Sequence, residues 1–443
     1  MSKRLPQIFV LLFFCISTAQ ETPKVEFLTF ADCLERTMAN NLALQHGLLG
    51  EQVALTQYKA SYGKLLPEIT ATGDNRNSWG KEIDSDTNLF VDEALHTNEG
   101  TLNANFNLFA GFAVWKNIKA EKQDRQISKI NVERIKNDIT IDLAQRYITI
   151  LYLQEIIEAN KLQIKSSEKQ IELAQLKFDN GSVSESEVFK IKAQKASEEL
   201  TLITNQNNLT DNLISIKQLM NLAIDTEIAL SKPDLEINPL TNLDQQQYDL
   251  TKTAVNRHPA FRKSQLETDR ARTELSLARS LRFPVITGRM FWRTNFSSTE
   301  DMIPTHEQIS GNANTAIRFF ITIPIFSRFQ TWAEVKTAKL EWKQAQIFSK
   351  LEENRLSKEV MKAITDTRTS IKKRDASALA FEFTQKSLGA DDLKFELGKI
   401  NINEWSLTKM NYNKAQATLI QSRYELLFNN ALIKFYLGEA FSL

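Results

Sequence analysis

The chain has 443 residues and a balanced charge, with 55 Lys and Arg against 54 Asp and Glu. This balance provides no basic surface for nucleic acid, and no nucleic-acid-binding signature occurs. With only 13 Gly and 9 Pro, the composition favours long elements with few turns over a chain of small loop-rich domains.

Residues 1–19 have the pattern of a secretory signal peptide. Lys3 and Arg4 precede an apolar run, and small residues end at Ala19, where we expect cleavage. No later segment approaches 18 consecutive apolar residues, so we expect no transmembrane helix in the mature chain.

The chain has two cysteines. Lipidation of Cys15 would make the protein a lipoprotein, but the bulky Phe13 and Phe14 differ from the usual lipidation pattern, so this remains the lesser alternative. Cys33 would be the one thiol left after cleavage, and we expect a small buried helix residue with no disulfide.

The first predicted helix covers residues 29–65, with Thr29-x-x-Asp32 as its N-terminal cap and Pro67 as its stop. Strands are predicted at 67–79 and 99–109. Along the second strand, apolar residues alternate with polar ones: Leu102, Ala104, Phe106 and Leu108 against Thr101, Asn103, Asn105 and Asn107. A period of two predicts one apolar and one polar face. Polar loops are expected between the strands.

The long stretch that follows contains neither Gly nor Pro from Phe112 to Asn180 and predicts one helix at 112–178. At about 1.5 Å per residue it would span roughly 100 Å. An apolar residue recurs at every seventh position, at Leu143, Ile150, Ile157, Ile164, Ile171 and Phe178. This spacing predicts an apolar seam against a neighbouring helix.

A tight turn follows, in which Gly181 ends the long helix and Ser184-x-x-Glu187 begins another at 185–222. The whole pattern then recurs at an offset of 217 residues (284 − 67, from Pro67 and Pro284). We therefore predict two tandem copies, 20–226 and 248–443, joined by an irregular linker at 227–247 with room for a short strand. The second copy has helix 248–282, strands 284–296 and 315–326, long helix 329–395 and helix 402–438.

Each chain has four amphipathic strands, and each strand is close to the length that crosses a bilayer when the strand is tilted. An open sheet in lipid would leave backbone groups unpaired, so the chain must join with copies of itself. Two copies would give 8 strands with a filled interior, whereas three give 12 strands and room for a pore. The polar strand faces favour the trimer, with the helices extending the barrel as a helical tube.

With its predicted helices and strands in this order, the chain resembles the TolC-like outer membrane efflux protein family of Gram-negative bacteria. The resemblance covers nearly the whole mature chain. It is carried by the duplicated element order and by short motifs at Leu65-Leu66-Pro67, Arg282-Phe283-Pro284, Leu108-Phe109-Ala110-Gly111 and the turns at Gly181 and Gly398.

The resemblance implies a mainly α fold with a trimeric 12-stranded β-barrel in the outer membrane and a long α-helical barrel in the periplasm. It implies a passive exit duct in a tripartite efflux or type I secretion system, with a periplasmic adaptor, an inner-membrane pump of the RND or ABC type and outer membrane lipid as partners. Neither enzymatic activity nor a cofactor is implied. The cargo, the pump class and the opening mechanism stay open.

Three sets of site residues follow from the resemblance. The adaptor-docking tips are Gly181, Ser182, Val183, Ser184, Gly398, Lys399, Ile400 and Asn401. The periplasmic constriction is assigned to Glu187, Phe395 and Glu404. The lipid-facing strand positions are Phe106, Leu108, Ile286, Trp292, Ile321 and Ile323.

Plainer interpretations accompany these assignments. Glu187 and Glu404 are also explained as capping residues of their own helices, which we prefer to a role in selectivity. The scattered histidines predict no metal site, and no catalytic motif occurs. The alternative to a channel is a non-channel periplasmic coiled-coil scaffold whose hairpins cap helical bundles.

Overall fold

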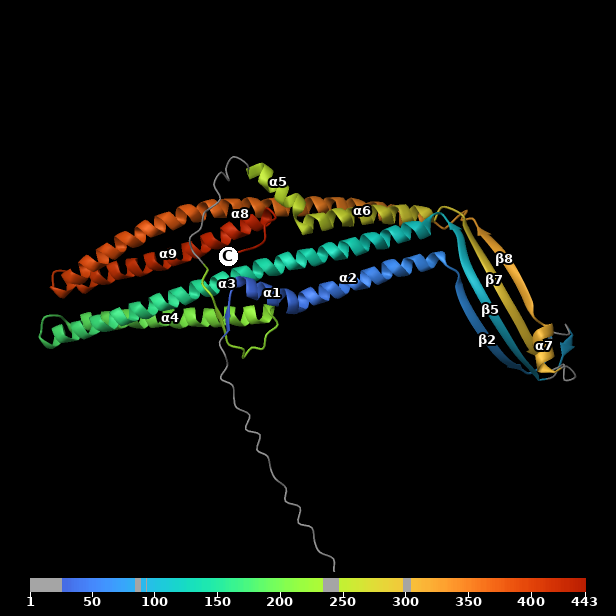
Figure 1. The fold of residues 1–443 in the computed structure, drawn as a ribbon, viewed down its shortest axis with the longest axis horizontal. Helices are drawn as coiled ribbons and strands as arrows, with labels where there is room; N and C mark the ends of the chain where they lie inside the picture. The colour runs from blue at the N-terminus through green and yellow to red at the C-terminus, as the bar shows by residue number, and fades with distance from the viewer. Residues whose placement is uncertain (1–25, 84–88, 93, 234–246, 298–303) are drawn as a thin grey trace, which may run out of the picture. The chain divides into compact units, whose positions relative to one another are not determined.

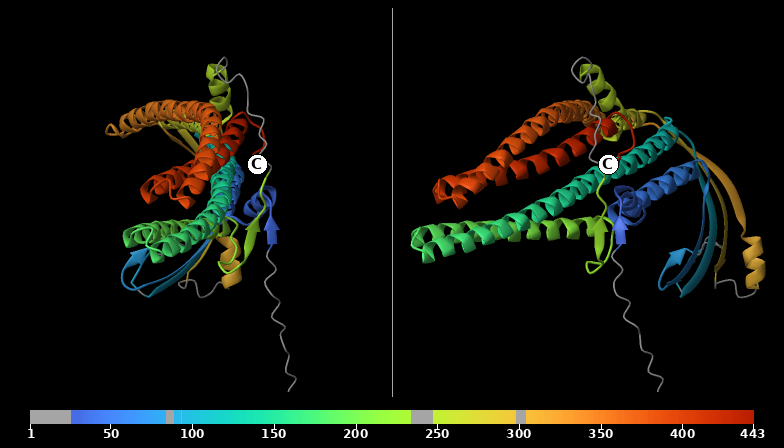
Figure 2. Two further views of the ribbon diagram at one scale, coloured as in Figure 1. Left: turned by 90° about the vertical axis from the view of Figure 1, so that its left-hand side faces the viewer. Right: turned by 60° about the vertical axis from the view of Figure 1, so that its left-hand side comes forward.

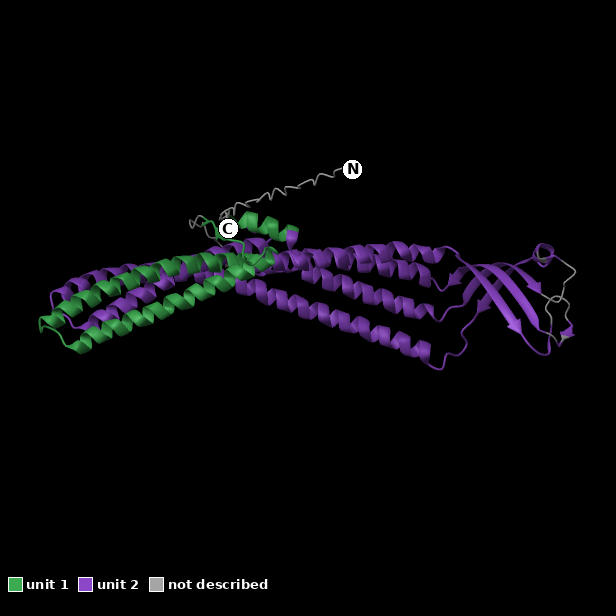
Figure 3. Ribbon diagram, turned by 90° about the horizontal axis from the view of Figure 1, so that it is seen from below, with its two compact units in different colours: residues 1–39, 143–235, 443 green, residues 40–142, 236–442 purple. Residues whose placement is uncertain are grey.

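A computed structural model describes residues 26–83, 89–92, 94–233, 247–297 and 304–443. The predicted signal peptide, Cys15 and most of the predicted linker lie outside these residues. The chain divides into two compact units, one of residues 1–39, 143–235 and 443 and the other of 40–142 and 236–442 (Figure 3).

The first unit contains α1 (Phe30–Asn40, except its last residue), α4 (Glu185–Leu219) and the C-terminal part of α3 (Ala113–Asp179). Two short strands, β1 (Glu26–Leu28) and β6 (Ile228–Leu230), pair in parallel beside them. The buried Tyr147 of α3 ties both strand ends to the helix, because its hydroxyl donates to the carbonyls of Ser231 at 2.7 Å and Leu28 at 3.3 Å. Burial raises the pKa of this hydroxyl and keeps it protonated.

The seam of α3 follows the predicted positions only in its first part. Leu143, Ile150 and Ile157 are buried, but farther along Ile164 is half-buried while Ser167 is completely buried. The buried stripe there is mostly polar and lies at Gln163, Ser167 and Gln170, followed by Ala174. A straight helix drifts by about 20° per heptad, which moves the seam away from a strict seven-residue repeat. Ser167 is paired in this stripe, since its Oγ donates to Glu198 of α4 at 2.6 Å.

The second unit carries an antiparallel four-stranded sheet in the order β2-β5-β7-β8, whose strands curve together (Figure 2). The strands are β2 (Glu68–Ser78), β5 (Leu95–Ala110), β7 (Val285–Ser297) and β8 (Asn314–Thr322). The central pair β5–β7 joins strands from the two halves of the sequence. β8 ends four residues before the predicted boundary, since Pro324 has no N–H to continue a ladder.

Four helices of this unit run up to one end of the sheet (Figure 1): α2 (Leu42–Ser61) with the 3-10 turn η1 (Tyr62–Leu65), the N-terminal part of α3, α6 (Pro259–Ser280) and α8 (Gln330–Glu396). The unit also contains α5 (Gln247–Arg257) and α9 (Ile402–Tyr436). α8 packs along both α6 and α9. The predicted loops contain further structure, namely the strands β3 (Glu82–Ile83) and β4 (Phe90–Val91) and the helix α7 (Thr305–Gly311).

Each predicted opening helix, 29–65 and 248–282, is interrupted near its first third. At Asn41 the backbone is extended, and the side chain accepts a hydrogen bond from the Leu44 N–H at 3.1 Å. At His258 the backbone is also extended, and Nδ1 accepts from the Ala260 N–H at 3.2 Å, with Pro259 opening the next helix. A polar side chain that caps a new helix competes with continuation of the old one, and a proline favours its first turn.

The cap at His258 is expected to depend on pH. Burial lowers the pKa of His258, and Arg355 and Arg134 lower it further, while Glu352 raises it. A base with a depressed folded-state pKa contributes stability that is complete above its unfolded pKa of about 6.5 and is lost as the pH falls below it. Protonation of Nδ1 removes the acceptor for Ala260, worth about 1 kcal/mol locally.

We therefore expect faster amide exchange at residues 254–262 at pH 5.5 than at pH 7.5, after correction for intrinsic exchange. His258→Asn retains a capping side chain that does not titrate, so this local pH dependence should disappear in the variant. Equal protection of the native segment at both pH values would contradict the role of the imidazole.

The two transitions from strand to long helix share an unusual backbone. Gly111 and Phe112 before α3 both have positive φ, and so do Arg328 and Phe329 before α8. Each transition is braced by an edge-to-face aromatic pair, Phe109 with Phe112 at 5.4 Å and Phe326 with Phe329 at 5.8 Å. Side chains with positive φ are strained, and the aromatic contacts offset part of that cost.

Gly111→Ala is expected to destabilise the first transition by about 1–3 kcal/mol. A Cβ at this positive-φ position would lie 2.7 Å from the Ser280 carbonyl oxygen and 2.8 Å from Cβ of Phe283. Thermal unfolding of the purified protein measures the change. Gly73→Ala in β2 is the control, because a Cβ there meets nothing within 4 Å, and an equal effect of both substitutions would refute the steric argument.

Candidate functional site

One face of the sheet is apolar across all four strands. The register places Ile69, Leu102, Met290 and Trp292, together with Ile317, Phe319 and Ile321, on this face. These side chains are between 42% and 67% exposed, in contrast to the usual burial of large apolar groups. An exposed apolar face of this extent indicates an interaction with lipid or with another protein.

The register relates the predicted lipid-facing positions to this face. Phe106, Ile286, Trp292 and Ile321 lie on it. Ile323 follows the last residue of β8 and is exposed.

Leu108 departs from the predicted alternation. The β5–β7 register shifts between Asn107 and Phe109, so that Phe109 lies opposite Ile286 and Leu108 is the extra residue of a bulge. Strict alternation cannot anticipate such an insertion, and Leu108 takes no position in that ladder.

Phe106 covers a gap in the apolar face. Its partner on β7 is Gly288, and the Phe106 ring occupies the space that a side chain at Gly288 would need. An aromatic ring laid over a cross-strand glycine shields the bare backbone. Phe106 and Gly288 therefore form one continuous apolar surface, although Gly288 has no side chain of its own.

The opposite face is polar and carries arginines. Arg289 donates from Nε to Oδ1 of the buried Asn103 at 3.0 Å. Arg318 lies across the ladder from Arg289, and its guanidinium is 5.0 Å from the ring centre of Phe291. Phe291 and Phe320 belong to this polar face, which the sequence pattern did not reveal, since both interrupt a simple polar-apolar alternation.

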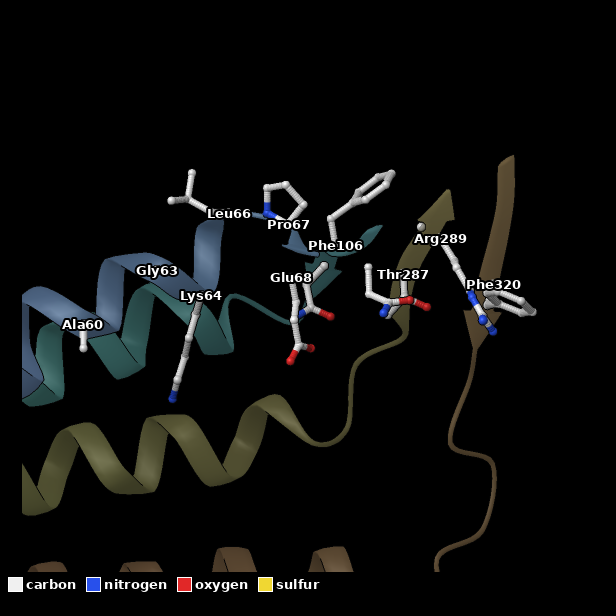
Figure 4. Close-up of a pocket in the computed structure, with 13 residues that line it drawn as sticks. Ala60, Gly63, Lys64, Leu66, Pro67, Glu68, Phe106, Thr287, Arg289 and Phe320 are labelled. Atoms are coloured by element: carbon white, nitrogen blue, oxygen red, sulfur yellow. The ribbon is translucent and has the colours of Figure 1, made fainter. Parts of the chain in front are cut away.

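A cavity of about 690 Å³ opens on this face where η1 meets the sheet (Figure 4). Lys64 and Glu68 point toward one side of the strands, whereas Leu66, Pro67 and Phe106 point toward the other (Figure 4). The separation of polar and apolar side chains therefore begins at the chain segment that enters β2.

The turn after α3 belongs to the first unit. Gly181 has a φ of 70°, its N–H donates to the Phe178 carbonyl at 2.8 Å, and the Ser182 N–H donates to the Lys177 carbonyl at 2.8 Å. This pair of bonds is the glycine-dependent helix end that the sequence predicts. Ser184 takes the N-cap backbone conformation but makes no side-chain capping bond, so the predicted Ser-Glu capping box does not form. Glu187 is half-buried.

The turn after α8 belongs to the second unit and is more tightly bonded. Gly398 has a φ of 69°, and the same two backbone bonds end the helix. Asn401 Oδ1 accepts from the N–H of Glu404 at 3.0 Å, and Asn401 Nδ2 donates to the Glu404 carboxylate at 2.8 Å. Asn401 is therefore the capping residue, and the Glu404 carboxylate supports it through the side-chain amide instead of the backbone N–H that a capping box uses.

Behind this turn lies a small aromatic core. Phe395 stacks on Trp405 with ring centres 5.4 Å apart, and the two side chains are 4% and 1% exposed. Trp405 Nε1 donates to Asp392 at 2.7 Å, and the Lys409 ammonium lies 5.2 Å from the Trp405 ring centre. Phe395 thus packs inside its own hairpin, and its place at the periplasmic constriction stays a prediction.

No pattern in the sequence indicated that Trp405, Lys409 and Asp392 support this turn. Trp405 and Asp392 are 13 residues apart on different helices, and their contact depends on how the hairpin closes. The available signal was a tryptophan directly after Glu404, in the first turn of the helix.

Among the described residues, no three or more His, Cys, Asp or Glu side chains are placed to hold a metal ion. Cys33 is buried, and burial raises the pKa of its thiol to about 12. A thiol so strongly protonated is a poor nucleophile and metal ligand. Within the same described ranges, no helix is both long enough and apolar enough to cross a lipid bilayer.

Comparison with known proteins places this geometry in a family. The sequence is 20% identical over 410 residues to "Outer membrane protein TolC" of Escherichia coli strain K12, covering 91% of this chain and 81% of that protein. The fold is similar to the CmeC outer membrane channel of Campylobacter jejuni, with a TM-score of 0.81, 15% identity and coverage of 94% and 87%. It is also similar to the open state of the MtrE outer membrane channel of Neisseria gonorrhoeae, with a TM-score of 0.75, 15% identity and coverage of 99% and 97%. The family model "Outer membrane efflux protein" matches residues 33–222 and again 250–439. The chain belongs to the outer membrane efflux protein family.

Proposed function

We propose that this protein is the outer-membrane channel-tunnel of a tripartite efflux or type I secretion system, a passive duct for substrates delivered by an inner-membrane pump. The observation that supports this most strongly is the sheet, which combines an exposed apolar face with a polar face and continues into long helices. A lipid-facing surface and a water-filled interior require these two faces.

The proposed assembly is a homotrimer. In one chain β2 and β8 are the edge strands of the sheet, and their outer backbone groups need partners in lipid. Pairing β2 of one protomer with β8 of the next closes a barrel of 12 strands, a size that leaves a pore. The double match of the family model supports two tandem copies in each chain.

The helix turns are the proposed contact sites for a periplasmic adaptor. They comprise Gly181, Ser182, Val183 and Ser184 in one turn and Gly398, Lys399, Ile400 and Asn401 in the other. All except the half-buried Val183 and Ile400 are exposed. Glu187 and Glu404 remain the proposed acidic positions near the periplasmic constriction, where a ring of Glu404 from three protomers would favour cations.

Fractionation and conductance test the proposal. We expect extraction from outer membranes only with detergent, a trimer by light scattering, and discrete conductance steps in a planar bilayer. The competing interpretation, a periplasmic scaffold, requires recovery without detergent and no conductance. A detergent-free, non-conducting monomer would overturn the channel and the trimer together.

A further inference from the structure

A second cavity, of about 800 Å³, lies within the second unit beside the start of α3. It is lined by the first turns of α3, the C-terminal half of α6 and Trp342 of α8. Lys116 is in the first turn of α3 and Arg279 is in the last turn of α6, so one end of this groove lies where both helices meet the sheet.

The groove is strongly cationic. Lys116, Lys119, Arg272 and Arg279 line it, against a single carboxylate, Asp269. In the part of the chain that the structure describes, no ion pair joins any of these four cations to a carboxylate.

The neighbouring Arg270 shows that the same helix also builds neutralised sites. Its guanidinium bonds to Asp124 at 2.8 Å and also to Glu274. The lack of such partners in the groove is therefore a local property of its lining.

The surroundings of Lys116 show the cost of this arrangement. Lys116 Nζ donates to the Ser276 carbonyl at 2.9 Å and to Ser280 Oγ at 2.8 Å, neither of which carries a charge. Burial lowers the pKa of Lys116, and the nearby charge of Arg279 lowers it further, as expected where like charges are not neutralised. An anion between these cations would relieve the repulsion.

Gln123 adds a second and independent feature. Its side chain lines the groove and is only 9% exposed, yet its Oε1 has no hydrogen-bond partner. A buried acceptor without a donor is unfavourable and is commonly satisfied by a bound molecule or ordered water. A ligand for this groove should therefore carry a hydroxyl as well as negative charge.

We propose that the groove binds a phosphate ester that bears a free hydroxyl, with the four cations around the phosphate and Gln123 accepting from the hydroxyl. Arginine and lysine are the usual ligands of phosphate oxygens. The same chemistry occurs in a glycerol-bearing phospholipid headgroup and in a free phosphate ester. Binding of a lipid headgroup rests on the proposed function, because only a membrane-embedded protein presents this groove to a bilayer surface. Binding of a free phosphate ester does not depend on that function.

Calorimetric titration of the full-length protein in an uncharged detergent distinguishes these sources. The probes are glycerol 1-phosphate, dihexanoyl phosphatidylglycerol and, as the lipid control, dihexanoyl phosphatidylcholine. Binding of phosphatidylglycerol well above phosphatidylcholine supports the headgroup, and saturable binding of glycerol 1-phosphate alone supports the free ester. Absence of binding by both anionic probes overturns the site.

The double variant Arg272→Gln, Arg279→Gln should weaken binding at least about tenfold, since each replacement removes a charge-assisted hydrogen bond. Lys122→Gln is the matched control, because Lys122 is an exposed cation of α3 outside the groove lining. Gln123→Leu should weaken binding of the hydroxylated probes while leaving the charge of the groove unchanged.

Unchanged affinity in the double variant, with an unchanged thermal unfolding temperature, would overturn the assignment. A protein that binds glycerol 1-phosphate but forms no conducting channel would refute the proposed function and leave this site standing.

Discussion

Leu102→Lys is expected to abolish assembly in the outer membrane, whereas Thr101→Lys, one residue earlier on the same strand, should permit it. Leu102 is near the middle of β5, lies opposite Ala71 and Trp292, and is 47% exposed on the apolar face. A lysine facing lipid at the bilayer midplane costs about 2–4 kcal/mol, and a trimer repeats this cost three times. Such a sum is comparable with the whole stability of a typical domain.

Thr101 provides a close control because it faces the other way. It lies opposite Thr72 and Arg293, and its hydroxyl donates to Glu99 at 3.1 Å. A lysine there adds the same charge and length but remains on the polar face, with Glu99 nearby to offset the charge of Arg293. Membrane fractionation and a heat-modifiable trimer band after electrophoresis would compare the two variants. Normal trimer formation by Leu102→Lys would show that the apolar face does not contact lipid.

The sequence was sufficient to predict which face of the sheet most strand residues occupy, because the alternation of side chains along a strand also determines which residues pair across the ladder. The prediction failed where a bulge inserts one residue and changes the register. The bulge at Leu108 shifts every later residue of β5 by one position relative to β7, and no side-chain pattern announces it. Pairing across the two halves of the chain, as between Asn103 and Arg289, depends on which strands become neighbours.

The helices show the same limit in a different form. Absence of Gly and Pro indicated the 67-residue helix α3, and the repeat indicated α8, which has the same length although it contains Gly389. The break at Asn41 was not indicated, because it depends on one capping side chain that competes with a continuous helix. Pro259 was an available signal for the break at His258, since a proline disfavours the interior of a helix. Burial within α3 shifts from an apolar to a mostly polar stripe, in which Ser167 donates to Glu198 of α4, a contact that the sequence of α3 alone does not show.

Trp405→Ala is expected to unfold the end of the α8–α9 hairpin and to remove export while leaving the trimer and its conductance in place. Removing a fully buried tryptophan costs about 3–5 kcal/mol. Here the substitution deletes the stack on Phe395, the bond to Asp392 and the ring beneath the Lys409 ammonium. This cost falls on a short segment far along the sequence from every strand, so it should be local.

Hydrogen exchange measures that loss directly. We expect amides between residues 391 and 409 to lose protection in Trp405→Ala, and those of α8 near Val360 to keep it, because Val360 packs in a separate core with Ile364 and Ile433. Trp405→Phe retains a ring against Phe395 but gives up the N–H bond to Asp392, and it should lose only about 1 kcal/mol. Leu407→Ala, at a residue that is 55% exposed, is the control and should behave as the native protein does. If the aromatic core holds the turn in the form that an adaptor recognises, export should fall in the order of these local stabilities. Full export by a Trp405→Ala protein with an unprotected turn would separate adaptor recognition from the structure of this hairpin.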